Sequence, residues 1–141
     1  MSLRGVSAIL VLVLASGRLA SGTDDSAKVA AAQSAVLEWA ALMDQGRYED
    51  CWNSLAESTK AKMPKAQWLV YINGVRKPMG VLKARKQTKA EYVPSLKNLP
   101  DQDGAIIAFQ SSFESRSSVL ETFGVIHEKD GQWRVGHYLT N

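Results

Sequence analysis

Two histidines are the first side chains that could bind a metal or transfer a proton. His127 and His137 flank Asp130-Gly131, the strongest short hairpin signal in the chain. A two-residue turn there pairs His127 with Arg134. In the same register His137 lies opposite Gly124, and the imidazoles point to opposite faces, because side chains alternate along a strand. A three-residue loop with a bulge would place both on one face. Neither arrangement adds the clustered carboxylates or cysteines of a zinc site, so we predict no metal and no cofactor.

Acid–base catalysis needs a carboxylate or imidazole on the inner face of a sheet, with neighbours that shift its pKa. Glu91, Glu114 and Glu121 lie on or beside predicted strands. We interpret Glu91 as solvated, because it shares a strand face with lysines. Glu114 and Glu121 border a loop that contains Arg116, which favours ordinary surface pairing. The serines between residues 111 and 118 lack the nucleophile-elbow pattern, and the sequence therefore predicts no catalytic residue.

Aromatic side chains could line a pocket for a small molecule, although in most proteins they fill the core. We single out Trp133, His137 and Tyr138 as candidates for a pocket or an interface. In the two-residue-turn register, Trp133, Val135 and His137 share one face of the sheet, and Tyr138 lies on the other. Both faces are then partly apolar, which predicts that helices cover one and a partner subunit covers the other.

The single cysteine, Cys51, excludes an internal disulfide. Its position between Tyr48 and Trp52 on a predicted helix favours burial as a small apolar side chain. A reactive thiol or an intermolecular bridge is the alternative.

A run of basic residues extends from the end of the third predicted helix into the first predicted strand. We interpret it as the solvated face of an edge strand, where lysines discourage the addition of another strand. Interleaved aromatic residues are missing, which argues against nucleic-acid binding, whereas contact with an acidic envelope component stays open. The run comprises Arg76, Lys77, Lys83, Arg85, Lys86 and Lys89.

The apolar spacing predicts three helices: from Asp24–Ser26 to Gly46, from Tyr48 to Ala56, and from Pro64 to Pro78–Gly80. From Val81 onward the period changes to two, which predicts strands over residues 81–92, 105–113, 119–128 and 133–139. Helices followed by antiparallel strands indicate an α+β domain. We expect three N-terminal helices packed on a curved, cone-like antiparallel sheet of about four strands.

The first residues are typical of a secretory signal, with Arg4 followed by an apolar run over residues 5–15. The run is about half as long as the ~20 apolar residues of a membrane span, so we expect the protein not to be embedded in the membrane. Small residues fit cleavage after Gly22, and Gly17 offers a second fit. Gly22 also stands where a lipoprotein would carry cysteine. We therefore predict a cleavable signal over residues 1–22, one domain over residues 23–141, and a periplasmic or secreted location.

The formal charge of +3 depends on this signal, because two of the 17 basic residues, Arg4 and Arg18, lie within it. The remaining basic residues nearly balance the 14 acidic ones. The charge of the domain therefore gives no argument for nucleic acid or an anionic membrane as partner.

Three short patterns resemble the bacterial family known as domain of unknown function 4019, and the resemblance extends from about Ala27 to Leu139. His137 departs from it, because it occupies a glycine position of the family pattern. The resemblance implies a cone-shaped fold, cystatin-like or similar to nuclear transport factor two, but no functional residues. The patterns are D-x-G-x-Y from Asp44 to Tyr48, R-x-P-x-G from Arg76 to Gly80, and K-D-G-Q-W-R-V from Lys129 to Val135.

These features favour an exported, non-enzymatic binding or dimerisation module. Its partner would be a small ligand or an envelope protein, and a homodimer is one form of the hypothesis. The alternative is a small acid–base enzyme, of the isomerase or hydrolase type, with a pocket inside the cone. An enclosed pocket with a desolvated acid or histidine would favour the enzyme, whereas a filled cone with an exposed apolar sheet face would favour the module.

Overall fold

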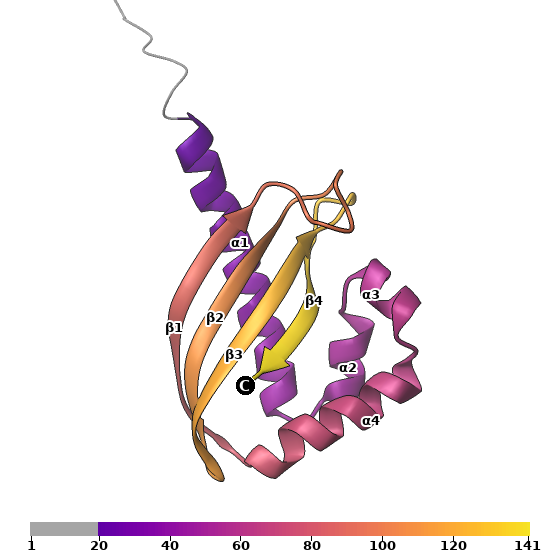
Figure 1. Ribbon diagram of the computed structural model, residues 1–141, viewed down its shortest axis with the longest axis vertical. Coiled ribbons are helices and arrows are strands. Elements are labelled where there is room, and N and C mark those ends of the chain that lie inside the picture. Colours follow the sequence, from indigo (N-terminus) through magenta and orange to yellow (C-terminus); the bar gives the residue numbers. More distant parts are fainter. Residues whose placement is uncertain (1–19) are drawn as a thin grey trace, which may run out of the picture.

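The computed structural model describes residues 20–141, and the predicted signal residues before Ala20 lie outside this part of the chain. Helix α1 (Ala20–Asp44) is the longest element (Figure 1). It buries one stripe of small and large apolar residues at helical spacing. The stripe is Ala32, Val36, Trp39, Ala40 and Met43.

Gly46 ends α1, as the sequence predicts. Its φ of 73° is strained for residues with a Cβ. The N–H of Gly46 donates to the carbonyl of Met43 at 3.0 Å, and the N–H of Arg47 donates to that of Leu42 at 2.9 Å. This pair of bonds is a Schellman motif, which satisfies the last carbonyls of the helix.

Three short helices follow: α2 (Tyr48–Asn53), α3 (Glu57–Lys62) and α4 (Lys65–Arg76), which continues into a 3₁₀ turn, η1 (Lys77–Met79). The prediction that the second helix reaches Ala56 was wrong, and α3 was not predicted. The N–H of Ala56 donates instead to the carbonyl of Val135 at 2.9 Å. A tertiary hydrogen bond to the sheet thus replaces the next helical one.

The sheet has four strands in the order β1-β2-β3-β4, and all neighbours are antiparallel. The strands are β1 (Leu82–Val93), β2 (Gly104–Phe113), β3 (Arg116–His127) and β4 (Trp133–Thr140). The predicted α+β class is confirmed. In Figure 1 the sheet is curved, α1 crosses behind it, and α2, α3 and α4 lie beside β4. Only α1 therefore lies along the inner face, and the shorter helices close its β4 side.

The β3–β4 hairpin differs from the predicted two-residue turn in two places. Its loop has one more residue, and β4 contains one bulged residue. Its loop has three residues, because the N–H of Glu128 donates to the carbonyl of Gln132 at 2.8 Å and Gly131 has a φ of 85°. His127 consequently pairs with Trp133 rather than Arg134. A bulge at Gly136 then restores the predicted pairing of His137 with Gly124.

The bulge decides which side chains of β4 face α1. The earlier assignment of Trp133 and Val135 to the face of His137 was wrong, because the residue count changes at Gly136. Val135 and Tyr138 both join the core on the inner face, where Trp133 packs against it, whereas His137 is exposed on the outer face. The two histidines lie on opposite faces, as the two-residue turn predicted. The expectation that a three-residue loop with a bulge would place both on one face was wrong, because the bulge at Gly136 lies between Trp133 and His137 and shifts the register by one residue.

Aromatic rings fill the space between α1 and the inner face. Trp39 lies with its ring centroid 6.0 Å from Phe123 and 5.7 Å from Tyr138, and Phe109 packs edge-on to Phe123 at 5.7 Å. These four side chains are at most 7% exposed.

Within residues 20–141, no helix has the length and apolar character needed to cross a bilayer.

Candidate functional site

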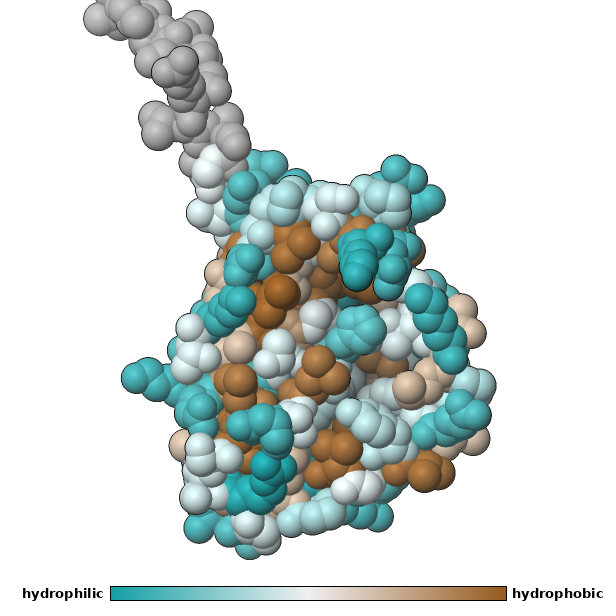
Figure 2. All heavy atoms as spheres, in the orientation of Figure 1, coloured by the Kyte–Doolittle hydropathy of each residue, from teal (hydrophilic) through white to brown (hydrophobic). Residues whose placement is uncertain are grey.

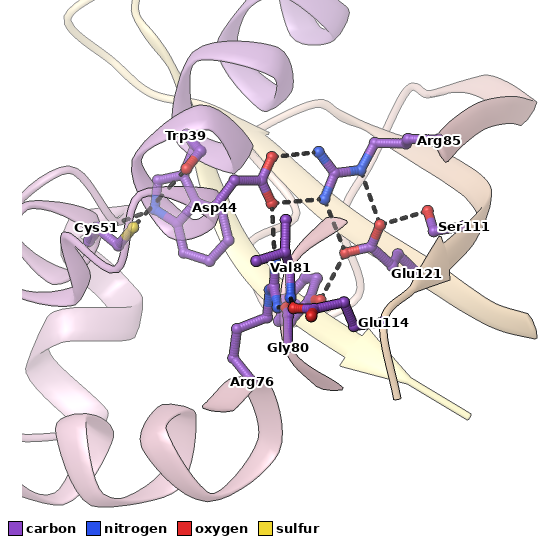
Figure 3. A network of polar contacts seen from close by, with 11 residues as sticks. Trp39, Asp44, Cys51, Arg76, Gly80, Val81, Arg85, Ser111, Glu114 and Glu121 are labelled. Atoms are coloured by element: carbon purple, nitrogen blue, oxygen red, sulfur yellow. Dashed lines mark hydrogen bonds and ion pairs between the residues drawn. The ribbon is translucent and has the colours of Figure 1, made fainter. Parts of the chain in front are cut away.

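A buried carboxylate, Glu121, lies on the inner face and is 0% exposed (Figure 3). One of its oxygens accepts hydrogen bonds from Arg85 Nε at 2.8 Å and from the Ser111 hydroxyl at 2.5 Å. The other accepts from the Tyr138 hydroxyl at 2.6 Å and from an Arg85 guanidinium N–H at 3.3 Å. Both oxygens are therefore fully engaged inside the protein.

Arg85 connects this carboxylate to the end of α1. Its two terminal nitrogens donate to the Asp44 carboxylate at 2.7 and 3.0 Å, and the Arg85 side chain is 10% exposed. Arg76 reaches the same carboxylate at 3.2 Å, and it also donates to the carbonyl of Gly80 at 2.7 Å. Two arginines and two carboxylates thus hold α1, α4, β1 and β3 together.

The titration behaviour of this network fits a structural role. Burial lowers the pKa of Arg85, but its hydrogen bonds to Asp44 and Glu121 outweigh that effect and raise it overall. Burial and the nearby charge of Glu121 raise the pKa of Tyr138 well above its usual range. Arg85 stays charged and Tyr138 stays protonated, and both oxygens of Glu121 accept hydrogen bonds within the protein.

The structure contradicts two sequence interpretations at this network. Glu121 is not a surface residue, and Arg76 and Arg85 do not belong to a solvated basic face. A signal for Glu121 was present in the sequence, because it alternates with Val119, Phe123 and Val125, which are all buried. Glu91 and Glu114 are exposed, as predicted, and Glu91 pairs with Lys89 at 3.1 Å.

A second polar cluster lies at the opposite end of the sheet, around Asp103. One carboxylate oxygen accepts the Tyr92 hydroxyl at 2.7 Å and the Lys28 ammonium at 3.1 Å. The other lies 2.9 Å from His127 Nδ1. Partial burial of Asp103 raises its pKa, but these three hydrogen bonds outweigh it and lower the pKa to about 2.

His127 in this cluster stacks on Trp133, with ring centroids 4.3 Å apart and planes 1° from parallel. The imidazole side chain is 28% exposed. Asp103 therefore fixes the orientation of the ring through Nδ1, an arrangement in which Nε2 could exchange protons with solvent or a substrate. The sequence does not predict this pair, because Asp103 lies between two predicted strands and His127 was considered only together with His137.

The three candidate residues of β4 do not form one site. Trp133 is half-buried against His127, Tyr138 is 7% exposed with its hydroxyl on Glu121, and His137 is exposed on the outer face. An open depression of about 350 Å³ reaches Trp133, where the start of β4 meets α1 and the end of α2. Glu121, Asp103 and His127 do not line it.

None of the helices within residues 20–141 covers the outer face of the sheet (Figure 1). Leu120 and Leu139 on it are 39% and 57% exposed. Figure 2 shows apolar surface on this face, broken by polar side chains. Its other small or apolar residues, by the register of the strands, are Ile106, Ala108, Thr122 and Gly124.

Cys51 is buried, as predicted, with 0% exposure. Burial, together with the nearby charges of Asp50 and Asp44, raises the pKa of its thiol to about 12. Trp39 donates its indole N–H to the Cys51 carbonyl at 2.9 Å, and the thiol lies 3.7 Å from the Trp39 carbonyl (Figure 3).

In the part of the chain that the structure describes, no group of three or more His, Cys, Asp or Glu side chains could hold a metal ion.

Comparison with known proteins identifies one family. Its model, described as "Protein of unknown function (DUF4019)", matches residues 35–138. Comparisons with curated proteins and with solved structures returned no match. The cystatin-like cone therefore stays a prediction, while the resemblance of the three sequence patterns is confirmed. Because the match spans most of the described residues, the chain belongs to the DUF4019 family of proteins of unknown function.

Proposed function

We propose that the protein is an exported, non-enzymatic binding or dimerisation module that binds its partner through the sheet. The observation that carries the proposal is the contrast between the two faces of that sheet. Aromatic rings and the closed Glu121 network fill the inner face, whereas Leu120 and Leu139 are exposed on the outer face. An exposed apolar patch with a polar rim is typical of a protein interface.

Export accords with the position of the predicted cleavage site relative to the core. Gly22 lies at the start of α1, and nothing approaches within 4 Å of the position that its Cβ would occupy. From Asp24 onward, the first fully buried residue of α1 is Ala32. A peptidase could therefore unwind the chain around Gly22 without disturbing packed side chains, and the new terminus would begin at Thr23.

The processing step is tested by expressing the full chain in a bacterium and separating periplasm from cytoplasm. We expect the periplasmic form to begin at Thr23 by intact mass. A tryptophan at position 22 in place of glycine should block cleavage there, because that position requires a small residue. Retention of the full-length chain in the cytoplasm would overturn the proposed location.

The binding surface is tested by sedimentation velocity and native mass spectrometry of the purified protein. We expect self-association or a retained ligand, and we expect L120K/L139K to abolish it. V70K is the matched control, because Val70 is 77% exposed on α4, away from the sheet. A monomer without a bound molecule, or equal behaviour of both variants, would contradict the proposal.

The His127–Asp103 pair supports a second candidate function, acid–base catalysis. A carboxylate that orients an imidazole occurs in many hydrolases and isomerases. This candidate ranks second because His127 and Asp103 line neither the depression at Trp133 nor a second one between Glu57 and Arg134. Its test is a panel of ester and enolisable substrates: a turnover that H127A abolishes and that H137A leaves intact would establish it.

A further inference from the structure

The two edges of the sheet differ in whether other segments cover them. On β4, the carbonyl of Val135 accepts the N–H of Ala56 at 2.9 Å, and the carbonyl of Gly136 accepts the Thr59 hydroxyl at 3.0 Å. The α2–α3 segment therefore covers the middle of that edge. Within residues 20–141, the other edge strand, β1, pairs only with β2, and its far side has no strand beside it.

The free edge of β1 is long enough to accept another strand. β1 spans 12 residues, and most of its side chains are exposed. Register shifts at Leu82/Ala84 and Gln87/Lys89 divide its pairing with β2 into shorter regular runs, Ala84 to Gln87 and Lys89 to Val93. An unpaired edge offers backbone N–H and carbonyl groups to an added strand. α1 contacts β1 from the inner face, as in the 3.1 Å hydrogen bond between Gln33 and Gln87.

Charge limits what can pair with this edge. Lys89 pairs with Glu91, and Arg85 is engaged with Asp44 and Glu121. Lys83 and Lys86 are exposed, and within the described residues neither has a carboxylate at ion-pair distance. The edge therefore carries positive charge that nothing near it neutralises.

This charge argues against a second copy of the chain at the same edge. An antiparallel pairing of two β1 edges that sets Lys86 opposite Lys83 or Lys89 would place like charges beside each other. Like charges opposite each other destabilise paired strands. An acidic strand would instead place carboxylates beside Lys83 or Lys86, where opposite charges attract.

We infer that the free edge of β1 binds an acidic, extended segment of another protein by strand addition. The inference deepens the proposed binding function and rests on it. Backbone hydrogen bonds along β1 supply the pairing, and the lysines select against basic segments and against self-pairing. The apolar outer face next to β1 is left free for the remainder of the partner.

The test uses a fluorescein-labelled synthetic peptide of alternating threonine and glutamate, followed by fluorescence anisotropy with the purified protein. We expect saturable binding that weakens as salt is added. K83E/K86E should weaken it by about tenfold or more. K62E/K129E is the matched control, because both lysines are exposed, lie off this edge and change the net charge equally.

Two further peptides separate strand addition from simple charge attraction. The same sequence with alternate amides N-methylated keeps its charge but loses the hydrogen bonds of one edge, and we expect it to bind about tenfold more weakly. A threonine–lysine peptide should not bind. Equal binding of the N-methylated peptide, or no binding of the acidic peptide, would overturn the inference. Because L120K/L139K tests the outer face separately, failure at β1 would be distinguishable from failure of the proposed function.

Discussion

Arg85 and Glu121 form a buried ion pair between β1 and β3, with Arg85 Nε 2.8 Å from the Glu121 carboxylate. The two strands are not neighbours, because β2 lies between them. The pair spans this strand and encloses the Ser111 hydroxyl. A charged pair on an otherwise apolar face is stable only because each charge is compensated within the network.

Removing one charge of this pair should strongly destabilise the protein. We expect E121A to lower the free energy of unfolding by about 3 kcal/mol or more, because Arg85 stays buried with Asp44 alone. R85M/E121L should cost less than E121A, since no uncompensated charge remains. Urea denaturation followed by circular dichroism measures both. A larger loss in the double variant would show that the pair itself stabilises the fold.

The Asp103 cluster should make stability depend on pH in the acid range. Its hydrogen bonds lower the pKa of Asp103 from 3.8 to about 2. A lowered pKa in the folded state means that the contribution is fully present above the ordinary pKa and is lost as pH falls toward 2. Thermal melts between neutral pH and that value should show a decline in the wild type.

D103N should melt at a lower temperature near neutral pH, and its decline over the same acid range should be smaller. D101N is the control, because Asp101 is exposed in the same loop. Parallel pH curves for wild type and D103N would contradict the assignment of this acid dependence to Asp103.

The Cys51 thiol should be unreactive in the folded protein. Burial raises its pKa to about 12, so that the thiolate, which is the reactive form, is scarce. We expect no reaction with Ellman's reagent at about pH 8, and stoichiometric reaction once the protein is unfolded in guanidinium chloride. Rapid labelling of the folded protein would support the alternative of a reactive thiol.

Two glycines of the sheet should differ in their tolerance of alanine. A Cβ at Gly104 would overlap the carbonyl oxygen of Val125, whereas one at Gly124 would lie 3.4 Å from the nearest atom of His137. We expect G104A to cost about 3 kcal/mol, because a backbone atom must move. G124A should change stability by less than about 1 kcal/mol. Urea denaturation compares the two, and equal costs would contradict the packing argument.

The sequence predicted the elements well where the signal is local. Gly46 ends α1 because a left-handed residue is needed after the last turn, and the change from helical to alternating spacing at Val81 marks the start of the sheet. It failed at Ala56, where a hydrogen bond to Val135 ends the helical run. The partner of that bond is far away in sequence, so no local pattern could reveal it.

The candidate residues were harder to predict than the elements. Trp133, His137 and Tyr138 were grouped by their closeness on one strand, but alternation and the Gly136 bulge separate them. Asp103 and His127 were not grouped, although the fold brings them within 2.9 Å. Spacing along a strand predicts which residues share a face only where each residue pairs with one residue of the neighbouring strand. A bulge adds an unpaired residue and ends that regularity.

The sequence by itself determined the family, the α+β class and the order of helices before strands, because these depend on periodic patterns and short motifs. The tertiary structure alone decided that Glu121 is buried and paired, that β1 keeps a free edge, and that His127 contacts Asp103. The physical reason is distance along the chain. Burial and pairing depend on contacts between remote segments, and one bulged residue is enough to exchange the faces on which those contacts form.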